Sequence, residues 1–221
     1  MNYTLELELL SDATFGGGDG VAGLVDTEIE YDVRTGLPFL RGRTLRGLLV
    51  EECANVLFAL EQQGLLTISL QDAAKAMFGK PGSGNNDTGT LHVGAAKFPE
   101  DVEAAIRREV NNNRLTPAQT LDLLTGIRRQ TAVDYDREAP RDNSLRNHRF
   151  LLRKTRLYAR LEFFNEPSDL QVALLAAVAL SVRRAGSGRN RGRGKIKAIL
   201  RDANANCPAI DLLFQVKEAA A

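Results

Sequence analysis

The stretch Gly186-Ser187-Gly188-Arg189-Asn190-Arg191-Gly192-Arg193-Gly194 lies between a long apolar segment and a strand-like run at 195–200. The apolar segment begins at Pro167-Ser168-Asp169, a typical helix start. We expect this helix to run through Arg184, with Gly186 at its C′ position. The order is therefore helix, loop, strand. A dinucleotide-binding loop has the reverse order, with a strand before it and a helix after it, so that class of site is excluded.

The glycines and arginines of this stretch predict a phosphate-binding loop. Glycine lets the backbone approach a ligand closely, and arginine offers planar donors that bind phosphate in pairs. The alternative is a turn that is merely flexible, but arginine at alternate positions favours phosphate. The residues expected to contact nucleic acid here are Gly188, Arg189, Arg191 and Arg193.

The charge of the chain is unevenly distributed. The 221 residues carry a formal net charge of +1, but residues 1–127 contain 10 basic and 18 acidic side chains, whereas residues 128–201 contain 18 and 7. Arginine accounts for 22 of the 29 basic residues. This segregation predicts that a polyanion contacts the second half of the chain. A GC-rich genome would also raise the arginine content, but it would not cluster the arginines.

Hydrophobic alternation and helix caps predict an α+β fold. We expect strands at 3–9, 24–32, 91–98, 157–163 and 195–200, with a further edge strand at 212–216. We expect helices from a Thr44 cap to Gly64, at 100–110, from Thr116-Pro117 and at 167–184. Without insertions the order is strand, helix, strand, strand, helix, strand. This is the βαββαβ plan of a ferredoxin-like (RRM-like) core, which we expect as a single domain over 1–221.

The segment from about 128 to 149 interrupts this plan. It is charged, rich in arginine and too long for a tight turn, so we expect a projecting hairpin or arm. The alternative is an arm whose charges are only solvated. The candidate RNA contacts are Arg128, Arg129, Arg137, Arg141, Arg146 and Arg149, with Tyr135 available to stack on a base.

A second anion site is predicted where the first long helix begins. Free backbone amides at a helix N-terminus attract anions, and three arginines lie close to this helix start. The alternative is an ordinary capped helix with solvated arginines. The candidate RNA contacts are Arg41, Arg43, Thr44 and Arg46.

Taken in order, these segments resemble the RAMP superfamily (repeat-associated mysterious proteins), specifically the backbone subunits of type III CRISPR effector complexes. The matching segments are Gly16 to Gly20 followed by Asp26, Gly36-Leu37-Pro38 through Arg46-Gly47, Phe78-Gly79 with Gly89-Thr90-Leu91, and 186–194. They span nearly the whole chain. Where this chain has Arg41-Gly42-Arg43-Thr44-Leu45-Arg46-Gly47, the family usually has Pro-Gly-Ser-Ser-Leu-Lys-Gly, so Arg46 keeps a base at the lysine position.

The resemblance implies a subunit that polymerises along a CRISPR guide RNA. Its partners would be the guide RNA, complementary target RNA, neighbouring backbone subunits and other subunits of the effector complex. The segment 128–149 would be the thumb, which interrupts guide–target pairing at regular intervals. Catalytic members of the family carry an aspartate in the loop after the first strand, and it cuts the target RNA beside each thumb with a divalent metal.

Asp26 is the candidate for this aspartate and for the ligand of Mg²⁺ or another divalent metal. It follows the Gly-rich loop, where a carboxylate can reach a displaced nucleotide. Asp19 is the second candidate. Two alternatives stay open: a structural subunit that binds the guide without cutting, and an endoribonuclease that processes the guide precursor. The second alternative calls for a catalytic histidine, and the two histidines are His92, in a predicted strand, and His148, at the base of the arm.

The remaining features argue against other classes of protein. Cys53 and Cys207 lack metal-ligand spacing and cannot form a disulfide scaffold. The apolar run 172–182 is too short to span a bilayer, and Met1 leads directly into a strand pattern without a signal peptide. We therefore expect a cytoplasmic protein with no membrane partner.

Overall fold

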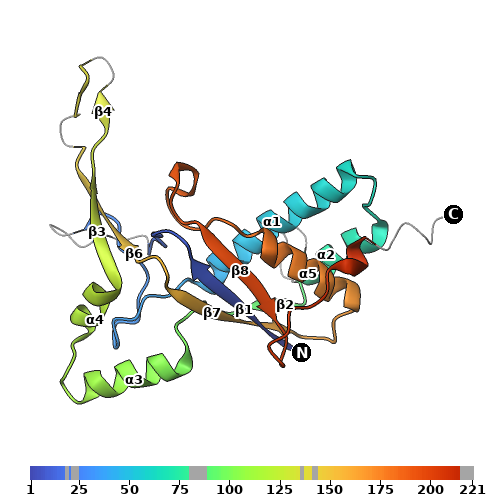
Figure 1. The fold of residues 1–221 in the computed structure, drawn as a ribbon, viewed down its shortest axis with the longest axis horizontal. Coiled ribbons are helices and arrows are strands. Elements are labelled where there is room, and N and C mark those ends of the chain that lie inside the picture. The colour runs from blue at the N-terminus through green and yellow to red at the C-terminus, as the bar shows by residue number, and fades with distance from the viewer. Residues whose placement is uncertain (18–19, 21–24, 80–88, 135–136, 141–143, 215–221) are drawn as a thin grey trace.

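The centre of the fold is a four-stranded antiparallel sheet in the order β2-β7-β1-β8 (Figure 1). The structure is a computed structural model that describes residues 1–17, 20, 25–79, 89–134, 137–140 and 144–214. The strands are β1 (Asn2–Leu9), β2 (Leu91–Val93), β7 (Arg156–Phe163) and β8 (Ile196–Arg201). With one long helix after β1 and another before β8, this order is that of a ferredoxin-like domain. The predicted fold class is confirmed.

One face of the sheet forms the core. In β1 the buried residues alternate with half-exposed ones, and Leu5 lies opposite Ala159 of β7 and Leu200 of β8. Because side chains alternate between the two faces of a strand, the three apolar series meet on one side. The strands predicted at 3–9, 157–163 and 195–200 are confirmed.

Three helices cover this face: α1 (Gly42–Gln62), α2 (Ile68–Phe78) and α5 (Asp169–Ser181), which lie together in Figure 1. Helix α5 packs against α1, α2 and β8. Because these elements surround α5, the helix is apolar on all sides, which explains the uninterrupted apolar run at 172–182. Among the described residues, no helix is long and apolar enough to cross a membrane.

The helix ends differ from the prediction at two places. Helix α1 begins at Gly42 after Arg41, with no side-chain cap, so Thr44 lies inside the first turn and is not the N-cap. Helix α5 ends at Ser181, because Arg184 forms a β-bridge with Lys195 and the chain must leave the helix before it. Gly186 is therefore a loop residue and not the C′ residue.

Other elements were missed or misassigned. Helix α2 was not predicted, although the Thr67 side chain caps it by accepting a hydrogen bond from the Leu70 amide. Between 25 and 32 there are isolated β-bridges where a strand was predicted, and 21–24 lie outside the described residues. At the C-terminal end, η2 (Asp211–Leu213) is a 3₁₀ helix in place of a predicted strand that extended into residues not described.

The chain between β2 and β7 contains a long hairpin that projects away from the sheet (Figure 1). Helices α3 (Glu100–Asn111) and α4 (Pro117–Leu124) lead into it. It consists of β3 (Thr125–Gln130) paired with β6 (Arg146–Leu151), and of β4 (Val133–Asp134) paired with β5 (Ala139–Pro140) further out. We call residues 125–151 the arm. The insertion predicted at about 128–149 lies within it.

Candidate nucleic-acid interface

A cavity of about 320 Å³ opens where three segments that are distant in the sequence meet. We call it the loop cavity. Its walls come from the loop after β1, the start of α1 and the loop after α5. The lining includes Gly16, Arg41, Thr44, Gly186, Ser187 and Arg189. The start of α1 and the loop at 186–194, which were both predicted to bind phosphate, therefore line the same cavity.

Close backbone contact joins two of these loops. The Ser187 amide donates a hydrogen bond to the Thr14 carbonyl at 2.8 Å, and the two residues form a β-bridge. Gly186 has a φ of +86°, and a Cβ atom there would lie 2.6 Å from the Thr14 carbonyl oxygen. Only glycine fits this position without displacing the backbone.

Arg189 is held by a carboxylate in the structure. It begins the 3₁₀ helix η1 (Arg189–Arg191), which is flanked by left-handed Gly188 and Gly192. Its Nη1 and Nη2 donate to the two carboxylate oxygens of Glu51 at 3.0 and 2.9 Å. These hydrogen bonds and the charge of Glu51 hold the pKa of Arg189 above its ordinary value. A guanidinium binds phosphate through the same paired donors.

Arg193, in the loop after α5, experiences the charge of Arg128 in the arm. Burial, and then the charges of Arg128 and Arg191, lower the pKa of Arg193 from its ordinary value. Arginine nevertheless stays protonated in proteins. The charges of Arg128 and Arg191 thus repel that of Arg193, and a phosphate bound near these arginines would offset the repulsion.

The residues at the start of α1 divide into two groups. Arg41 and Thr44 line the loop cavity, and Arg41 forms an ion pair with Glu30, while Arg43 is exposed in the first turn. Arg46 instead donates to the Phe78 carbonyl at 2.6 Å, at the end of α2. It satisfies a carbonyl at a helix end and does not line the loop cavity.

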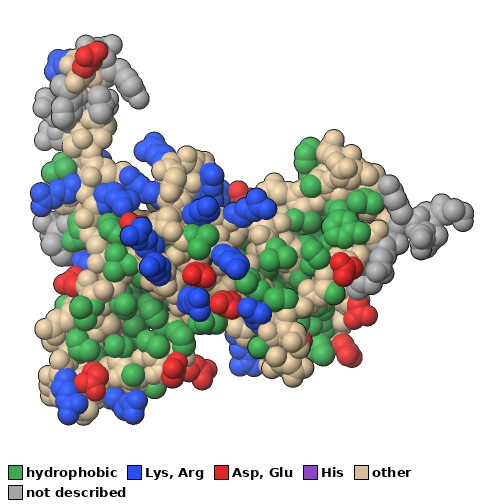
Figure 2. Space-filling model, in the orientation of Figure 1, with side chains coloured by type: hydrophobic (Ala, Val, Ile, Leu, Met, Phe, Trp, Pro, Cys, Tyr) green, Lys and Arg blue, Asp and Glu red, His purple; other side chains and the backbone are tan. Residues whose placement is uncertain are grey.

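Most of the described arginines of the arm are accessible. Arg129, Arg137 and Arg146 are exposed, and Arg128 is half-buried between Asp12, at 3.0 Å, and the Phe150 ring. Figure 2 shows Lys and Arg side chains gathered between the arm and the sheet. Tyr135 and Arg141 lie outside the described residues.

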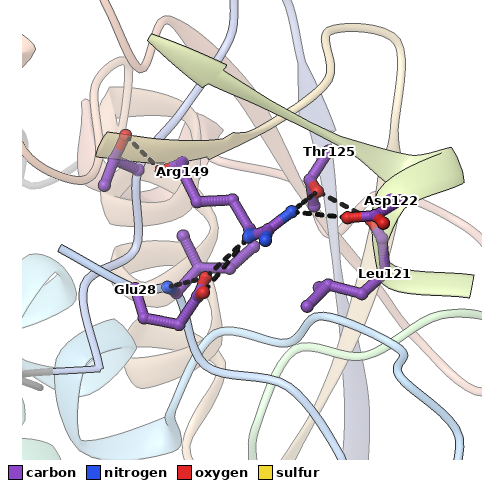
Figure 3. A network of polar contacts seen from close by, with 7 residues as sticks. Glu28, Leu121, Asp122, Thr125 and Arg149 are labelled. Carbon is purple, nitrogen blue, oxygen red and sulfur yellow. Dashed lines mark hydrogen bonds and ion pairs between the residues drawn. The ribbon is translucent and has the colours of Figure 1, made fainter. Parts of the chain in front are cut away.

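The prediction that Arg149 contacts RNA is wrong, because this residue lies in the interior and is only 4% exposed. Its Nε lies 2.9 Å from Glu28, and its Nη1 donates to Asp122 at 2.9 Å and to Thr125 at 3.0 Å (Figure 3). A guanidinium enclosed by these partners cannot reach RNA. Arg149 is therefore part of the structure of the arm and not an RNA contact.

Asp26 lies beside β6 of the arm with an exposed side chain, next to Asn147, which pairs with Arg129 near the outer end of the β3–β6 ladder. The Asn147 amide donates to its Oδ2 at 2.6 Å, and the Asp26 amide donates to the Asn147 carbonyl at 2.8 Å. Asp19 lies outside the described residues. His148 is half-buried on β6, and His92 is exposed on β2 with its ring centroid 6.5 Å from that of Phe164.

The donor set around Asp26 has consequences for a metal. Within the described parts of the chain, no group of three or more His, Cys, Asp or Glu side chains could hold an ion. A structural zinc or calcium site is thus not formed by these residues. One exposed carboxylate fits Mg²⁺, which keeps its waters and binds through one or two carboxylates together with substrate phosphates.

The acidic partners of the arginines are not predictable from the sequence. Glu28 is 121 residues from Arg149 along the chain, and Glu51 is 138 residues from Arg189. No local spacing connects such pairs. A net excess of acidic residues in the first half was the only signal, and it did not identify which carboxylates pair.

The family model of the RAMP superfamily matches residues 6–197. The chain belongs to the RAMP superfamily, and the family predicted from the sequence is confirmed. No curated protein matches the sequence.

Solved structures with a similar fold come from CRISPR complexes. A chain of type III-B Cmr-beta bound to cognate target RNA is 10% identical, with a TM-score of 0.63 over 90% of this chain and 97% of that chain. A chain of type III-B Cmr-beta in the apo state is 11% identical, with a TM-score of 0.64 over 92% and 98%. A chain of a type IV-B CRISPR complex is 16% identical, with a TM-score of 0.59 over the full length of both. At these identities the likeness concerns the fold alone.

Proposed function

We propose that this chain is a guide-RNA-binding backbone subunit of a CRISPR effector complex, and that it cleaves complementary target RNA at Asp26. The observation that carries the proposal is the position of Asp26. It lies beside β6 of the arginine-rich arm, hydrogen-bonded to Asn147, and the exposed Arg129 and Arg146 belong to the same pair of strands. Membership of the RAMP superfamily supports it, as does a fold shared over nearly the full length with chains of CRISPR complexes.

Guide binding would use the loop cavity and the loop after α5. Arg41 and Arg189 line the cavity, and Arg191 is exposed beside it. Guanidinium groups recognise phosphate by charge and by paired hydrogen bonds, without reading bases. Such a surface suits a guide whose sequence differs from one RNA to the next. The exposed arginines of the arm, Arg129, Arg137 and Arg146, would contact the RNA duplex or its displaced nucleotide.

Cleavage would depend on the orientation of the Asp26 carboxylate. The Asn147 amide fixes Oδ2, so the carboxylate has a defined direction relative to β6. Asp26 would hold Mg²⁺ or another divalent cation, which when bound would stabilise negative charge on the phosphate. The neighbouring ribose 2′-OH would lose its proton to solvent and attack the phosphorus in line, while the P–O5′ bond breaks and the 5′ oxygen leaves with a proton from solvent, giving a 2′,3′-cyclic phosphate and a 5′-OH end. The arm would keep the target nucleotide displaced from the duplex.

The test uses the assembled effector complex with its guide, complementary RNA and Mg²⁺, comparing wild type with Asp26→Ala. We expect regularly spaced products, and we expect the cuts made by this subunit to be missing in Asp26→Ala while target binding persists. The same products from both complexes would refute cleavage at Asp26. Cleavage of precursor RNA by the isolated chain would instead indicate a processing enzyme.

A second candidate function is a backbone subunit that binds the guide without cutting. The observation in its favour is that the Asp26 carboxylate already accepts a short hydrogen bond from Asn147, as a purely structural aspartate would. In this case Asp26→Ala would loosen the contact of this segment with β6 and change target binding, with no difference in products.

A further inference from the structure

Arg149 is a buried charge that the proposed function does not use. Its side chain is 5% exposed and that of Glu28 is 9% exposed, whereas that of Asp122 is 69% exposed. The guanidinium lies between Glu28 on one side and Thr125 with Asp122 on the other (Figure 3). It therefore links the segment that follows the Gly-rich loop with the end of α4 and the start of the arm.

The backbone of the same segment runs along β6. The Asp26 amide donates to the Asn147 carbonyl at 2.8 Å, and the Arg149 amide donates to the Thr27 carbonyl at 3.1 Å. Thr27 and His148 form a parallel β-bridge between these bonds. Asp26, Thr27 and Glu28 thus form a short additional edge of the arm.

The beginning of the same loop is joined to β6 as well. Ala13 and Leu151 exchange backbone hydrogen bonds of 3.1 and 2.8 Å, and the Thr14 hydroxyl donates to the Arg149 carbonyl at 3.0 Å. Residues on both sides of the Gly-rich loop are therefore joined to one strand of the arm. Asp26, which lies near the second junction, is positioned by the arm more than by the sheet.

Stability alone does not explain a buried ion pair at this position. Taking two charges out of water costs about as much as their attraction returns, and apolar side chains of similar size are often equally stable. A buried and directional contact does specify one arrangement of the segments it joins. Glu28 is two residues from Asp26, so the arrangement specified here includes the position of the Asp26 carboxylate.

We propose that Arg149 is a positioning residue, which acts through Glu28 to fix the Asp26 carboxylate relative to the arm. A movement of the arm on target binding then moves Asp26 with it. The effect on cleavage rests on the proposed function, but the fixing of residues 26–28 against β6 does not.

Two matched variants test this inference, because each removes one carboxylate charge from the same guanidinium. Glu28→Gln removes the buried partner next to Asp26, and Asp122→Asn removes the exposed partner on α4. Both are studied in the assembled complex with guide and complementary RNA. Three quantities are measured: amide hydrogen exchange at Asp26 and Arg149, the single-turnover cleavage rate at saturating target, and target affinity.

We expect faster exchange at the Asp26 and Arg149 amides in Glu28→Gln. We also expect cleavage to slow by roughly tenfold to a hundredfold, since small displacements of a catalytic group have effects of that size. Target affinity should stay at the wild-type value, and Asp122→Asn should match the wild type in all three measurements. A lower rate at unchanged affinity separates positioning from a general loss of structure.

Two results would overturn the inference. One is Glu28→Gln with wild-type exchange at Asp26 and Arg149. The other is faster exchange throughout β3 and β6 together with weaker target binding, because the pair would then hold the arm as a whole. If the wild type does not cleave, or if Asp26→Ala cleaves like the wild type, the nuclease proposal fails. The exchange at the Asp26 and Arg149 amides still decides the positioning inference in that case.

Discussion

Arg149 and Arg189 are both held by a glutamate, but one pair is inside the protein and the other is at its surface. The Arg149 and Glu28 side chains are 5% and 9% exposed, whereas those of Arg189 and Glu51 are 38% and 48% exposed. Water already competes for the second pair and hardly reaches the first. A phosphate can therefore replace Glu51 at Arg189, but nothing can replace Glu28 at Arg149 without opening the arm. The burial of the partner, and not the residue type, separates the arginine that shapes the protein from the arginine available to a ligand.

The largest expected effect is on the stability of Arg149→Ala. The substitution leaves the Glu28 carboxylate buried without its charge partner, and such losses cost about 3–5 kcal/mol. Chemical denaturation of the isolated chain should show this loss in the free energy of unfolding. Arg189→Ala is the control, and its free energy of unfolding should equal that of the wild type. Equal losses in the two variants would refute the distinction between the pairs.

The next effect is on RNA binding by Arg189→Ala. We expect several-fold weaker binding of single-stranded RNA, because one phosphate contact is lost. The slope of log affinity against log salt concentration should become shallower by about 0.7, the value for one contact to a single strand. Filter binding over a series of salt concentrations measures both quantities. An unchanged slope would mean that Arg189 does not contact phosphate.

A smaller effect of opposite sign is expected for Glu51→Gln. Removing the carboxylate frees the donors of Arg189, so RNA affinity should rise modestly. Glu52→Gln is the matched control, since it makes the same charge change one residue away, in the same helix. In an Arg189→Ala background, Glu51→Gln should act no more strongly than Glu52→Gln. An equal increase from both substitutions would indicate general electrostatics and not release of Arg189.

The smallest expected effect is on the labelling of the cysteines, which reports whether the loss of structure in Arg149→Ala extends beyond the arm. Burial in α1 raises the pKa of Cys53 to about 11, so its thiol stays protonated and protected at mildly alkaline pH, whereas Cys207 is exposed. Maleimide should therefore label one of the two cysteines in the wild type and in Arg149→Ala alike. Labelling of both in the variant would mean that the loss spreads from the arm into the core.

The sequence was sufficient for the elements that rely on local pattern. The alternation of Leu5, Leu7 and Leu9 predicted β1 correctly, and the Ser168 start of α5 followed from its cap. Helix α2 was not predicted, although Thr67 caps it at its N-terminal end. Arg149 was assigned to RNA because an arginine among exposed arginines looks like its neighbours in a sequence. Its buried environment depends on Glu28 and Asp122, which only the folded chain brings near.

The close approach of Gly186 to Thr14 determines which residues of the two loops can be substituted. The two loops are joined there by main-chain atoms, through the 2.8 Å hydrogen bond from the Ser187 amide to the Thr14 carbonyl. A hydrogen bond between main-chain atoms does not depend on the side chains around it, as long as residue 186 remains glycine. The side chains of the two loops can therefore change while this main-chain hydrogen bond is kept. We therefore expect Gly186 to be retained in related chains more strictly than the charged residues of the same loop.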